Sequence, residues 1–292
     1  MQLRNSIINR KKIVITGAAG FVGRSVVEKL IRENYFVISV DMNDPKIKSK
    51  YHKFYKLSVE KFFSKKKIKN IYAILHLASD PRNNYYYIKP DLALENISNT
   101  FIILNYIKTL KIKPMLIFSS TKQIELDTKE NNMGPYSISK KFSEEIISFY
   151  SKNYGIKSFI IRFTEVFSMN DNPKNKALKK LIDKCSKNEE IVVNDSNHHF
   201  EFISINVICK GIVKILKNKI KSRFINFYGN KLSIMDLLNK IKKNLKSSSE
   251  IKVKKKSKKN FSTKIDKEVN FKSIKTELFT SRLNQLIKNE LE

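Results

Sequence analysis

The chain is poor in cysteine, glycine and tryptophan: its 292 residues include two Cys, seven Gly and no Trp. Cys185 and Cys209 have neither CxxC spacing nor partner histidines, so they indicate neither a disulfide framework nor a zinc site. We expect both thiols to be reduced and buried. No segment approaches the roughly 18 to 20 uninterrupted apolar residues that cross a bilayer, and residues 1–12 lack the apolar core of a secretory signal. These absences predict a cytoplasmic protein without a membrane partner.

Acidic residues are also scarce: 27 Asp and Glu against 58 Lys and Arg give a formal net charge of +31. Such a surplus attracts polyanions, including nucleic acid, and would steer a phosphate-bearing substrate toward a basic cleft. The excess is nearly all Lys, however, and it accompanies abundant Asn and Ile, a composition typical of coding drift toward A and T. Because runs of charge more often form a solvated face than a specific interface, we assign the surplus to the surface and do not expect a nucleic-acid partner.

Short apolar runs rich in Ile and Val alternate with longer amphipathic stretches through the first half of the chain. This alternation predicts an α/β fold, in which a parallel sheet is covered by helices and joined by right-handed crossovers. The predicted strands are residues 12–16, 36–41, 73–78, 115–119 and 158–163. The predicted helices are residues 23–33, 92–108 and 137–154.

The regular alternation loosens after Phe167, and we expect a second, smaller lobe there. Its predicted elements are a turn at 170–173, a helix at 176–185, a strand at 224–228, a helix from 233 and a final helix from about 276. A strand at 201–205 and a helix at 207–216 are expected to rejoin the main sheet. The predicted domains are therefore 1–166 with about 200–222, and about 167–199 with 223–292. The Lys- and Ser-rich segment 246–264 is predicted to be mobile or solvent-facing.

Three of the seven glycines stand between the first predicted strand and the first predicted helix, at Gly17, Gly20 and Gly23. Glycine permits a tight turn and a close approach of the backbone to a pyrophosphate, and the helix N-terminus supplies aligned N–H groups and positive potential. This context predicts a dinucleotide site on a Rossmann-type doubly wound sheet. The residues expected to contact the dinucleotide are Gly17, Ala19, Gly20, Phe21, Val22 and Gly23.

Asp41 ends the second predicted strand, 18 positions beyond Gly23. A carboxylate there can accept hydrogen bonds from both hydroxyls of the adenosine ribose and would repel a 2′-phosphate, which favours NAD over NADP. The alternative is a turn-starting Asp, and nearby Lys46 and Lys48 leave phosphate binding open.

Tyr136 and Lys140 form a YxxxK pair at the start of a predicted helix, so they lie one turn apart on the same face. A nearby ammonium and a nicotinamide cation would lower the pKa of the phenol and make tyrosinate available as a base toward a substrate hydroxyl. The pair follows a strand that ends in Ser119-Ser120-Thr121.

Taken together, these motifs resemble the extended short-chain dehydrogenase/reductase superfamily, and specifically its NAD-dependent sugar epimerases and dehydratases, over essentially the whole chain. The matching segments, in chain order, are the TGxxGxxG-like turn at 16–23, the HLA(A/S)-like strand end at 76–79, Asn96, the Ser/Thr strand at 118–121, the PYxxSKxxxE-like segment 135–144, and the Ile161-Arg162-Phe163 strand. In the family this last strand leads into the substrate lobe, so the resemblance implies that the smaller C-terminal lobe binds the substrate.

The resemblance implies that Tyr136 is the catalytic base, that Lys140 also binds the nicotinamide ribose, and that Thr121 hydrogen-bonds the reacting oxygen. It places Leu77, Ala78, Ser79 and Asn96 beside the cofactor. It also implies a homodimer formed through the helices that start near Leu92 and Ser137.

The substrate side departs from the family pattern. Glu165 stands where Asn is usual, Val207 occupies an Asp position, and His198-His199-Phe200 replaces a phosphate-binding Arg. The VYG that often follows the catalytic strand is missing. The Asp-Glu pair of the dehydratases is replaced by Lys122 and Gln123, which supply no carboxyl group for elimination.

These observations predict an NAD-dependent sugar-modifying enzyme that epimerises a nucleotide sugar through a transient keto intermediate. One alternative is a dehydrogenase or reductase of a sugar, a uronate or a ketosugar, since Asp80-Pro81-Arg82 is reminiscent of uronate-dehydrogenase-like relatives. The other is a non-catalytic protein that binds NAD or nucleic acid, suggested by the charge and the altered substrate motifs.

Overall fold

A computed structural model describes residues 10–80, 82, 85–129, 133–168, 177–196, 198–227, 229–255, 283 and 287. The chain divides into two compact units, one made of Met1–Phe163 with Cys209–Asn226 and the other of Thr164–Ile208 with Phe227–Glu292. Within the described residues, no helix combines the length and apolarity needed to span a membrane.

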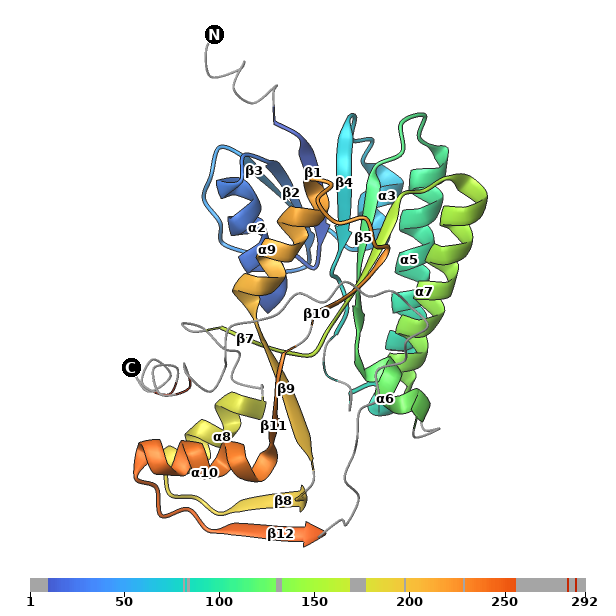
Figure 1. Cartoon of the computed structure of the whole chain (residues 1–292). Helices are drawn as coiled ribbons and strands as arrows, with labels where there is room; N and C mark the ends of the chain where they lie inside the picture. Colours follow the sequence, from blue (N-terminus) through green and yellow to red (C-terminus); the bar gives the residue numbers. More distant parts are fainter. Residues whose placement is uncertain are drawn as a thin grey trace. The chain divides into compact units, whose positions relative to one another are not determined.

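The first unit is built on a seven-stranded sheet, which confirms the α/β class and the Rossmann-type topology (Figure 1). Its strand order is β10-β6-β5-β4-β1-β2-β3. The bounds are β1 (Lys12–Thr16), β2 (Phe36–Asp41), β3 (His52–Lys56), β4 (Ile71–His76), β5 (Met115–Thr121), β6 (Ser158–Phe163) and β10 (Phe224–Phe227). The pairings from β3 to β6 are parallel. The strand order therefore reverses between β1 and β4, where sheets of this kind bind ligands at their carboxyl edge.

Helices cover both faces of this sheet, which explains the continuous apolar runs of its strands. The helices of the first unit are α2 (Phe21–Arg32), α3 (Val59–Lys65), α4 (Tyr85–Ile88), α5 (Asp91–Thr109), α6 (Gln123–Lys129), α7 (Pro135–Tyr154) and the later part of α9 (Ile205–Leu216). Figure 1 shows α5 and α7 running side by side. Buried side chains of α3, α5 and α7 form one cluster with those of the sheet, including Phe62, Ile103, Leu116, Ile147 and Ile160.

The second unit contains a three-stranded sheet in the order β11-β9-β7 and a two-stranded parallel sheet of β12 and β8. The bounds are β7 (Glu165–Phe167), α8 (Ala177–Ser186), β8 (Ile191–Asp195), β9 (His199–Ser204), β11 (Asn230–Ser233), α10 (Ile234–Leu245) and β12 (Ile251–Lys255). Buried side chains from both sheets, α8 and α10 form its core, together with Leu283 and Ile287.

Two predicted strands change places between the units. The strand predicted at 201–205 does not rejoin the main sheet: as β9 it pairs with β7 and β11, because alternate residues Phe200 and Phe202 pack into the core of the second unit. The strand predicted at 224–228 does not belong to the smaller lobe. As β10 it forms an edge of the seven-stranded sheet, where Ile225 and Phe227 are fully buried.

The prediction of a mobile or solvent-facing segment at 246–264 is wrong for its middle. Residues 251–255 form β12, in which alternating Ile251 and Val253 pack against the core of the second unit. Residues 256–264 and the turn predicted at 170–173 lie outside the described residues, as does the final helix apart from Leu283 and Ile287.

Candidate active site

The glycine turn connects β1 to α2, and its backbone geometry requires glycine at two positions. Gly17 has φ +72°, and a Cβ there would lie 2.6 Å from the backbone nitrogen of Ala78. A Cβ on Gly23 would lie 2.0 Å from the carbonyl oxygen of Gly17. The turn is therefore packed against the end of β4 on one side and against the first turn of α2 on the other. The turn itself carries no side chain at positions 17, 20 and 23, which allows its backbone to approach a pyrophosphate closely.

Asp41, at the end of β2, points its carboxylate at this turn. One oxygen accepts a hydrogen bond from the backbone nitrogen of Ala19 at 3.0 Å, and the other accepts one from Asn43 at 2.9 Å. The carboxylate is thus fixed beside the turn, with lone pairs left for the hydroxyls of an adenosine ribose. Together, the bare turn and the oriented carboxylate fit an NAD molecule.

The end of β4 is held against β1 by a buried imidazole. The Thr16 hydroxyl and His76 Nδ1 are 2.8 Å apart, and the backbone nitrogens of Leu77 and Ala78 donate to the carbonyl and hydroxyl oxygens of Thr16 at 3.1 and 3.4 Å. Burial, with a contribution from the Lys140 charge, lowers the pKa of His76 to about 3. The imidazole is therefore neutral at physiological pH, and it supports the backbone of residues 77–78.

Lys140 and Tyr136 lie one turn apart on α7. The Lys140 ammonium is buried and donates to the carbonyl oxygen of Ser119 at 2.9 Å, which ties α7 to β5. It lies 5.8 Å from the centre of the Tyr136 ring and 4.9 Å from that of Phe118. Burial lowers the pKa of Lys140 to about 7, against the opposing effect of the Glu144 carboxylate. The structure thus brings together two of the three predicted catalytic residues.

Thr121, the third, is the last residue of β5. Its hydroxyl oxygen accepts a hydrogen bond from the backbone nitrogen of Gln123 at 3.1 Å, at the start of α6. Because that bond uses a lone pair, the O–H remains able to donate to an oxygen of a substrate.

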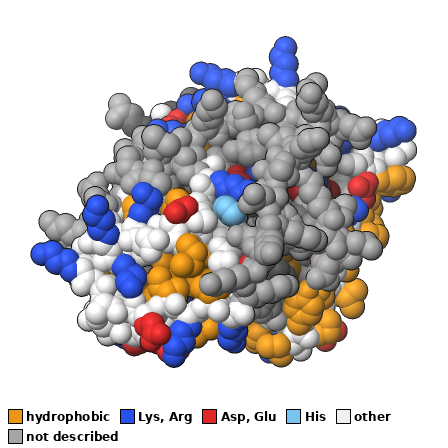
Figure 2. Space-filling view, turned by 60° about the horizontal axis from the view of Figure 1, so that its bottom comes forward, with side chains coloured by type: hydrophobic (Ala, Val, Ile, Leu, Met, Phe, Trp, Pro, Cys, Tyr) orange, Lys and Arg blue, Asp and Glu red, His pale blue; other side chains and the backbone are white. Residues whose placement is uncertain are grey.

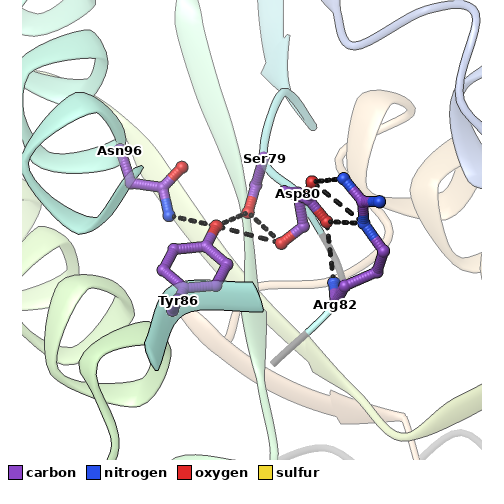
Figure 3. A network of polar contacts seen from close by, with 5 residues as sticks. All are labelled: Ser79, Asp80, Arg82, Tyr86 and Asn96. Atoms are coloured by element: carbon purple, nitrogen blue, oxygen red, sulfur yellow. Dashed lines mark hydrogen bonds and ion pairs between the residues drawn. The ribbon is translucent and has the colours of Figure 1, made fainter. Parts of the chain in front are cut away.

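A buried tyrosine, Tyr86, links the segment after β4 to Asn96 of α5 (Figure 3). Its hydroxyl donates to the carbonyl oxygen of Asp80 at 2.9 Å, accepts from Asn96 Nδ2 at 2.8 Å, and lies 3.4 Å from the Ser79 hydroxyl. The centre of its ring is 5.1 Å from that of Tyr136.

Asn96 extends this network toward α7. Its Nδ2 also donates to the Ser139 hydroxyl at 3.2 Å, and that hydroxyl donates to the carbonyl oxygen of Tyr136 at 2.7 Å. The sequence predicts Ser79 and Asn96 beside the cofactor, but it gives no signal that singles out Tyr86 from the adjacent Tyr85 and Tyr87. The burial that distinguishes Tyr86 from the exposed Tyr87 became visible only in the fold.

Among the substrate-side departures, Glu165, Val207 and the segment His198-His199-Phe200 lie in the second unit, whereas Lys122 and Gln123 lie in the first. The His198 and Phe200 rings meet edge to face, with centres 4.7 Å apart. Burial, followed by the charge of His199, lowers the pKa of His198. Within the described ranges, no group of three or more His, Cys, Asp or Glu side chains could hold a metal ion.

Comparison with known proteins identifies the family. The sequence profile of the NAD dependent epimerase/dehydratase family matches residues 13–226. The chain belongs to this family, and it is accordingly an NAD-dependent enzyme of the extended short-chain dehydrogenase/reductase type.

Curated relatives share a quarter to a third of their residues with this chain. A Methanocaldococcus jannaschii protein provisionally named as a UDP-glucose 4-epimerase is 30% identical over 230 residues, which cover 71% of this chain and 75% of the relative. CDP-abequose synthase from Salmonella muenchen is 27% identical over 250 residues, covering 82% and 83%. UDP-glucuronate 4-epimerase from Thermodesulfobacterium geofontis is 25% identical over 239 residues, covering 70% and 71%.

Solved structures share the fold. WbmF from Bordetella bronchiseptica, in complex with NADH, superposes with a TM-score of 0.75 at 19% identity, covering 98% of this chain and 92% of that one. UDP-N-acetylglucosamine 4-epimerase from Methanobrevibacter ruminantium, in complex with UDP-N-acetylmuramic acid, gives 0.73 at 20% identity and covers 97% and 98%.

Proposed function

We propose that this chain is a nucleotide-sugar epimerase that works through a transient keto intermediate. The observation that carries the proposal is the placement of Lys140, whose buried ammonium is tied to the Ser119 carbonyl one helical turn from Tyr136. Relatives of this chain include proteins named as epimerases of UDP-glucose and UDP-glucuronate, which supports a UDP-sugar as the substrate class.

The three catalytic residues have different tasks. Tyr136 takes the proton from a sugar hydroxyl and later returns it. Lys140 stabilises the tyrosinate electrostatically and donates to the ribose of the nicotinamide. The Thr121 hydroxyl donates to the reacting oxygen. NAD held beside these residues would supply the acceptor for the hydride of the same carbon and the source for its return to either face of the ketone.

The cofactor is assigned to the first unit and the sugar substrate to the second. The residues proposed to hold NAD are those of the glycine turn, Asp41, the backbone and hydroxyl groups at the end of β4, and Asn96. We place the pyrophosphate over the N-terminus of α2, because the backbone N–H groups there are aligned and carry positive potential. Gly17 and Gly23 keep the turn tight, since a side chain at either position would strike neighbouring backbone atoms.

Elimination of water is disfavoured by the residues that follow Thr121. A dehydratase needs a carboxyl acid and base at these positions, whereas this chain has Lys122 and Gln123. The Gln123 amide is already engaged, since its Nε2 donates to Asp127 at 2.5 Å.

We further propose a homodimer formed through α5 and α7. Large apolar side chains at helical spacing are exposed on both helices: Leu94 and Phe101 on α5, and Ile138, Phe142 and Phe149 on α7. By contrast, in the view of Figure 2 the Lys and Arg side chains of the described residues are dispersed among side chains of other types. Size-exclusion chromatography with light scattering should give a dimer, and Phe142→Glu combined with Phe149→Glu should give a monomer.

The proposed reaction is tested with a panel of UDP-, GDP-, CDP- and dTDP-sugars and free uronates incubated with the protein and NAD. Epimerisation predicts an isomerised sugar without accumulation of NADH. Tyr136→Phe should bind NAD like the wild type and turn nothing over. Net NADH formation would instead indicate a sugar dehydrogenase, and steep salt-dependent RNA binding without turnover would indicate a non-catalytic protein.

A further inference from the structure

Two carboxylates and a guanidinium form a buried network next to the catalytic helix. Arg162, in β6, donates from Nε and Nη2 to the two carboxylate oxygens of Glu144 at 2.8 and 2.5 Å. Its Nη1 donates to Glu125 Oε1 at 3.1 Å, and Asn226 Nδ2 donates to that same oxygen at 3.0 Å. The network therefore ties α6, α7, β6 and β10 of the first unit together.

These side chains are shielded from water to different degrees. The Glu144 side chain is 5% exposed, that of Arg162 is 13% exposed and that of Glu125 is 28% exposed. Burial works against the charge of Arg162, but the two carboxylates outweigh it and raise the pKa of the guanidinium. With two carboxylates on one guanidinium, the cluster carries a formal charge of −1.

Each carboxylate is close in sequence to a proposed catalytic residue. Glu144 follows Lys140 by one helical turn on α7, and Glu125 lies in the first turn of α6, just beyond Thr121. Glu125 also belongs to the segment in which the VYG of the family is missing. The network thus joins two residues of family-like segments, Glu144 and Arg162, to one in a segment where this chain departs from the family pattern.

We propose that Glu144 and Glu125, joined through Arg162, are positioning residues of the epimerase site: Glu144 holds Lys140 in its charged form, and Glu125 fixes the turn that orients the Thr121 hydroxyl. The inference rests on the proposed function, because Glu144 and Glu125 act only through Lys140 and Thr121.

The surroundings of Lys140 explain why a nearby negative charge matters. The groups that face its ammonium are the Ser119 carbonyl from β5, the Phe118 and Tyr136 rings, and the neutral His76 from β4. None of these four carries a negative charge. Glu144 opposes the effect of burial, so without its charge Lys140 would lose its proton at a lower pH. A neutral Lys140 would no longer stabilise a tyrosinate.

The link from Glu125 to Thr121 runs through the backbone of α6. Glu125 is anchored at its carboxylate by Arg162 and Asn226, and its backbone nitrogen donates to the carbonyl oxygen of Lys122 at 3.0 Å. The same turn carries the Gln123 nitrogen that donates to the Thr121 hydroxyl oxygen. Without the contacts of Glu125 to Arg162 and Asn226, this turn would be less fixed, and the Thr121 O–H would no longer be held in one direction.

The role of Glu144 is tested by titrating the tyrosinate absorbance of the NAD-loaded protein, with Tyr136→Phe subtracted to isolate Tyr136. Glu144→Gln should move the ionisation of Tyr136 to higher pH by about one unit. The pH range over which kcat is high should then narrow at its acidic end, through Tyr136, and at its alkaline end, through Lys140. Glu145→Gln removes the same charge from an exposed neighbouring position and should move neither. Equal titration curves for the two variants would overturn the role of Glu144.

The role of Glu125 is tested by comparing Glu125→Ala with Glu125→Gln. Both hydrogen bonds to Glu125 end on one oxygen, which a glutamine retains and an alanine lacks. We expect kcat to fall about tenfold or more in Glu125→Ala with KM little changed, and to recover largely in Glu125→Gln. Wild-type turnover in the alanine variant would refute this role. If the wild type epimerises no sugar, the proposed function fails, while the Tyr136 titration still decides the role of Glu144.

Discussion

Replacing Gly23 by alanine tests the glycine turn most directly. The added Cβ would lie 2.0 Å from the Gly17 carbonyl oxygen and 2.9 Å from the Ala18 Cα. Both are backbone atoms, so no change of rotamer relieves the contact. Because real Cβ atoms essentially never approach such atoms closer than 3.0 Å, the turn must open by about 1 Å.

The cost of that opening can be worked out for stability and for binding. Overpacking of this kind costs about 1–3 kcal/mol, and the better helix propensity of alanine returns about 1 kcal/mol. The net loss of unfolding free energy is then at most about 2 kcal/mol, so the variant should fold. A hydrogen bond to a charged phosphate contributes about 1.5–3 kcal/mol, so displacing one should weaken NAD binding roughly 10- to 100-fold.

Calorimetric titration with NAD and urea denaturation measure the two effects separately. Gly155→Ala is the matched control: φ is +64° at this position, and an added Cβ would meet no atom within 4 Å. It should lose about 1 kcal/mol of stability through backbone strain and bind NAD normally. Wild-type NAD affinity in Gly23→Ala would refute the assignment of this turn to the pyrophosphate.

Three further predictions concern the cofactor strands. Asp41→Asn should keep the fold and reduce the preference for NAD over NADP, measured as the ratio of the two dissociation constants; an unchanged ratio would contradict a ribose-binding carboxylate. Tyr86→Phe leaves the Asn96 amide and the Asp80 carbonyl without their shared partner, and should lower the unfolding free energy by about 1–3 kcal/mol in urea titrations, whereas a neutral effect would show that the network contributes nothing. Below pH 6.5 the unfolded chain protonates His76 while the folded protein does not, because its folded pKa is about 3, so stability should fall by about 1.4 kcal/mol per pH unit toward pH 5. This slope should be shallower in His76→Gln, and identical slopes would exclude His76 as its source.

Much of the fold of the first unit could be predicted, because the apolar pattern along each strand agrees with its burial in the folded sheet. The strands β1, β2 and β6 were predicted with their observed bounds, since each is a continuous apolar run buried on both faces. Besides the segment that contains β12, the errors concern β9 and β10, which carry similar aromatic and aliphatic runs. The local sequence of such a strand does not determine which of the two sheets it joins, because the pairing depends on strands far away in the chain.

By itself, the sequence determined the parts of the site that follow from spacing along one or two adjacent elements. The glycine turn, Asp41 and the Tyr136–Lys140 pair are of this kind, since strand-turn-helix geometry and the helical turn place them whatever the rest of the chain does. The tertiary structure alone decided the supports of those groups. Tyr86 contacts α5, α7 and the segment after β4, and Arg162 pairs with one carboxylate from α6 and one from α7. Such contacts join residues distant in sequence, and only the packing of the sheet and its helices brings them within hydrogen-bonding distance.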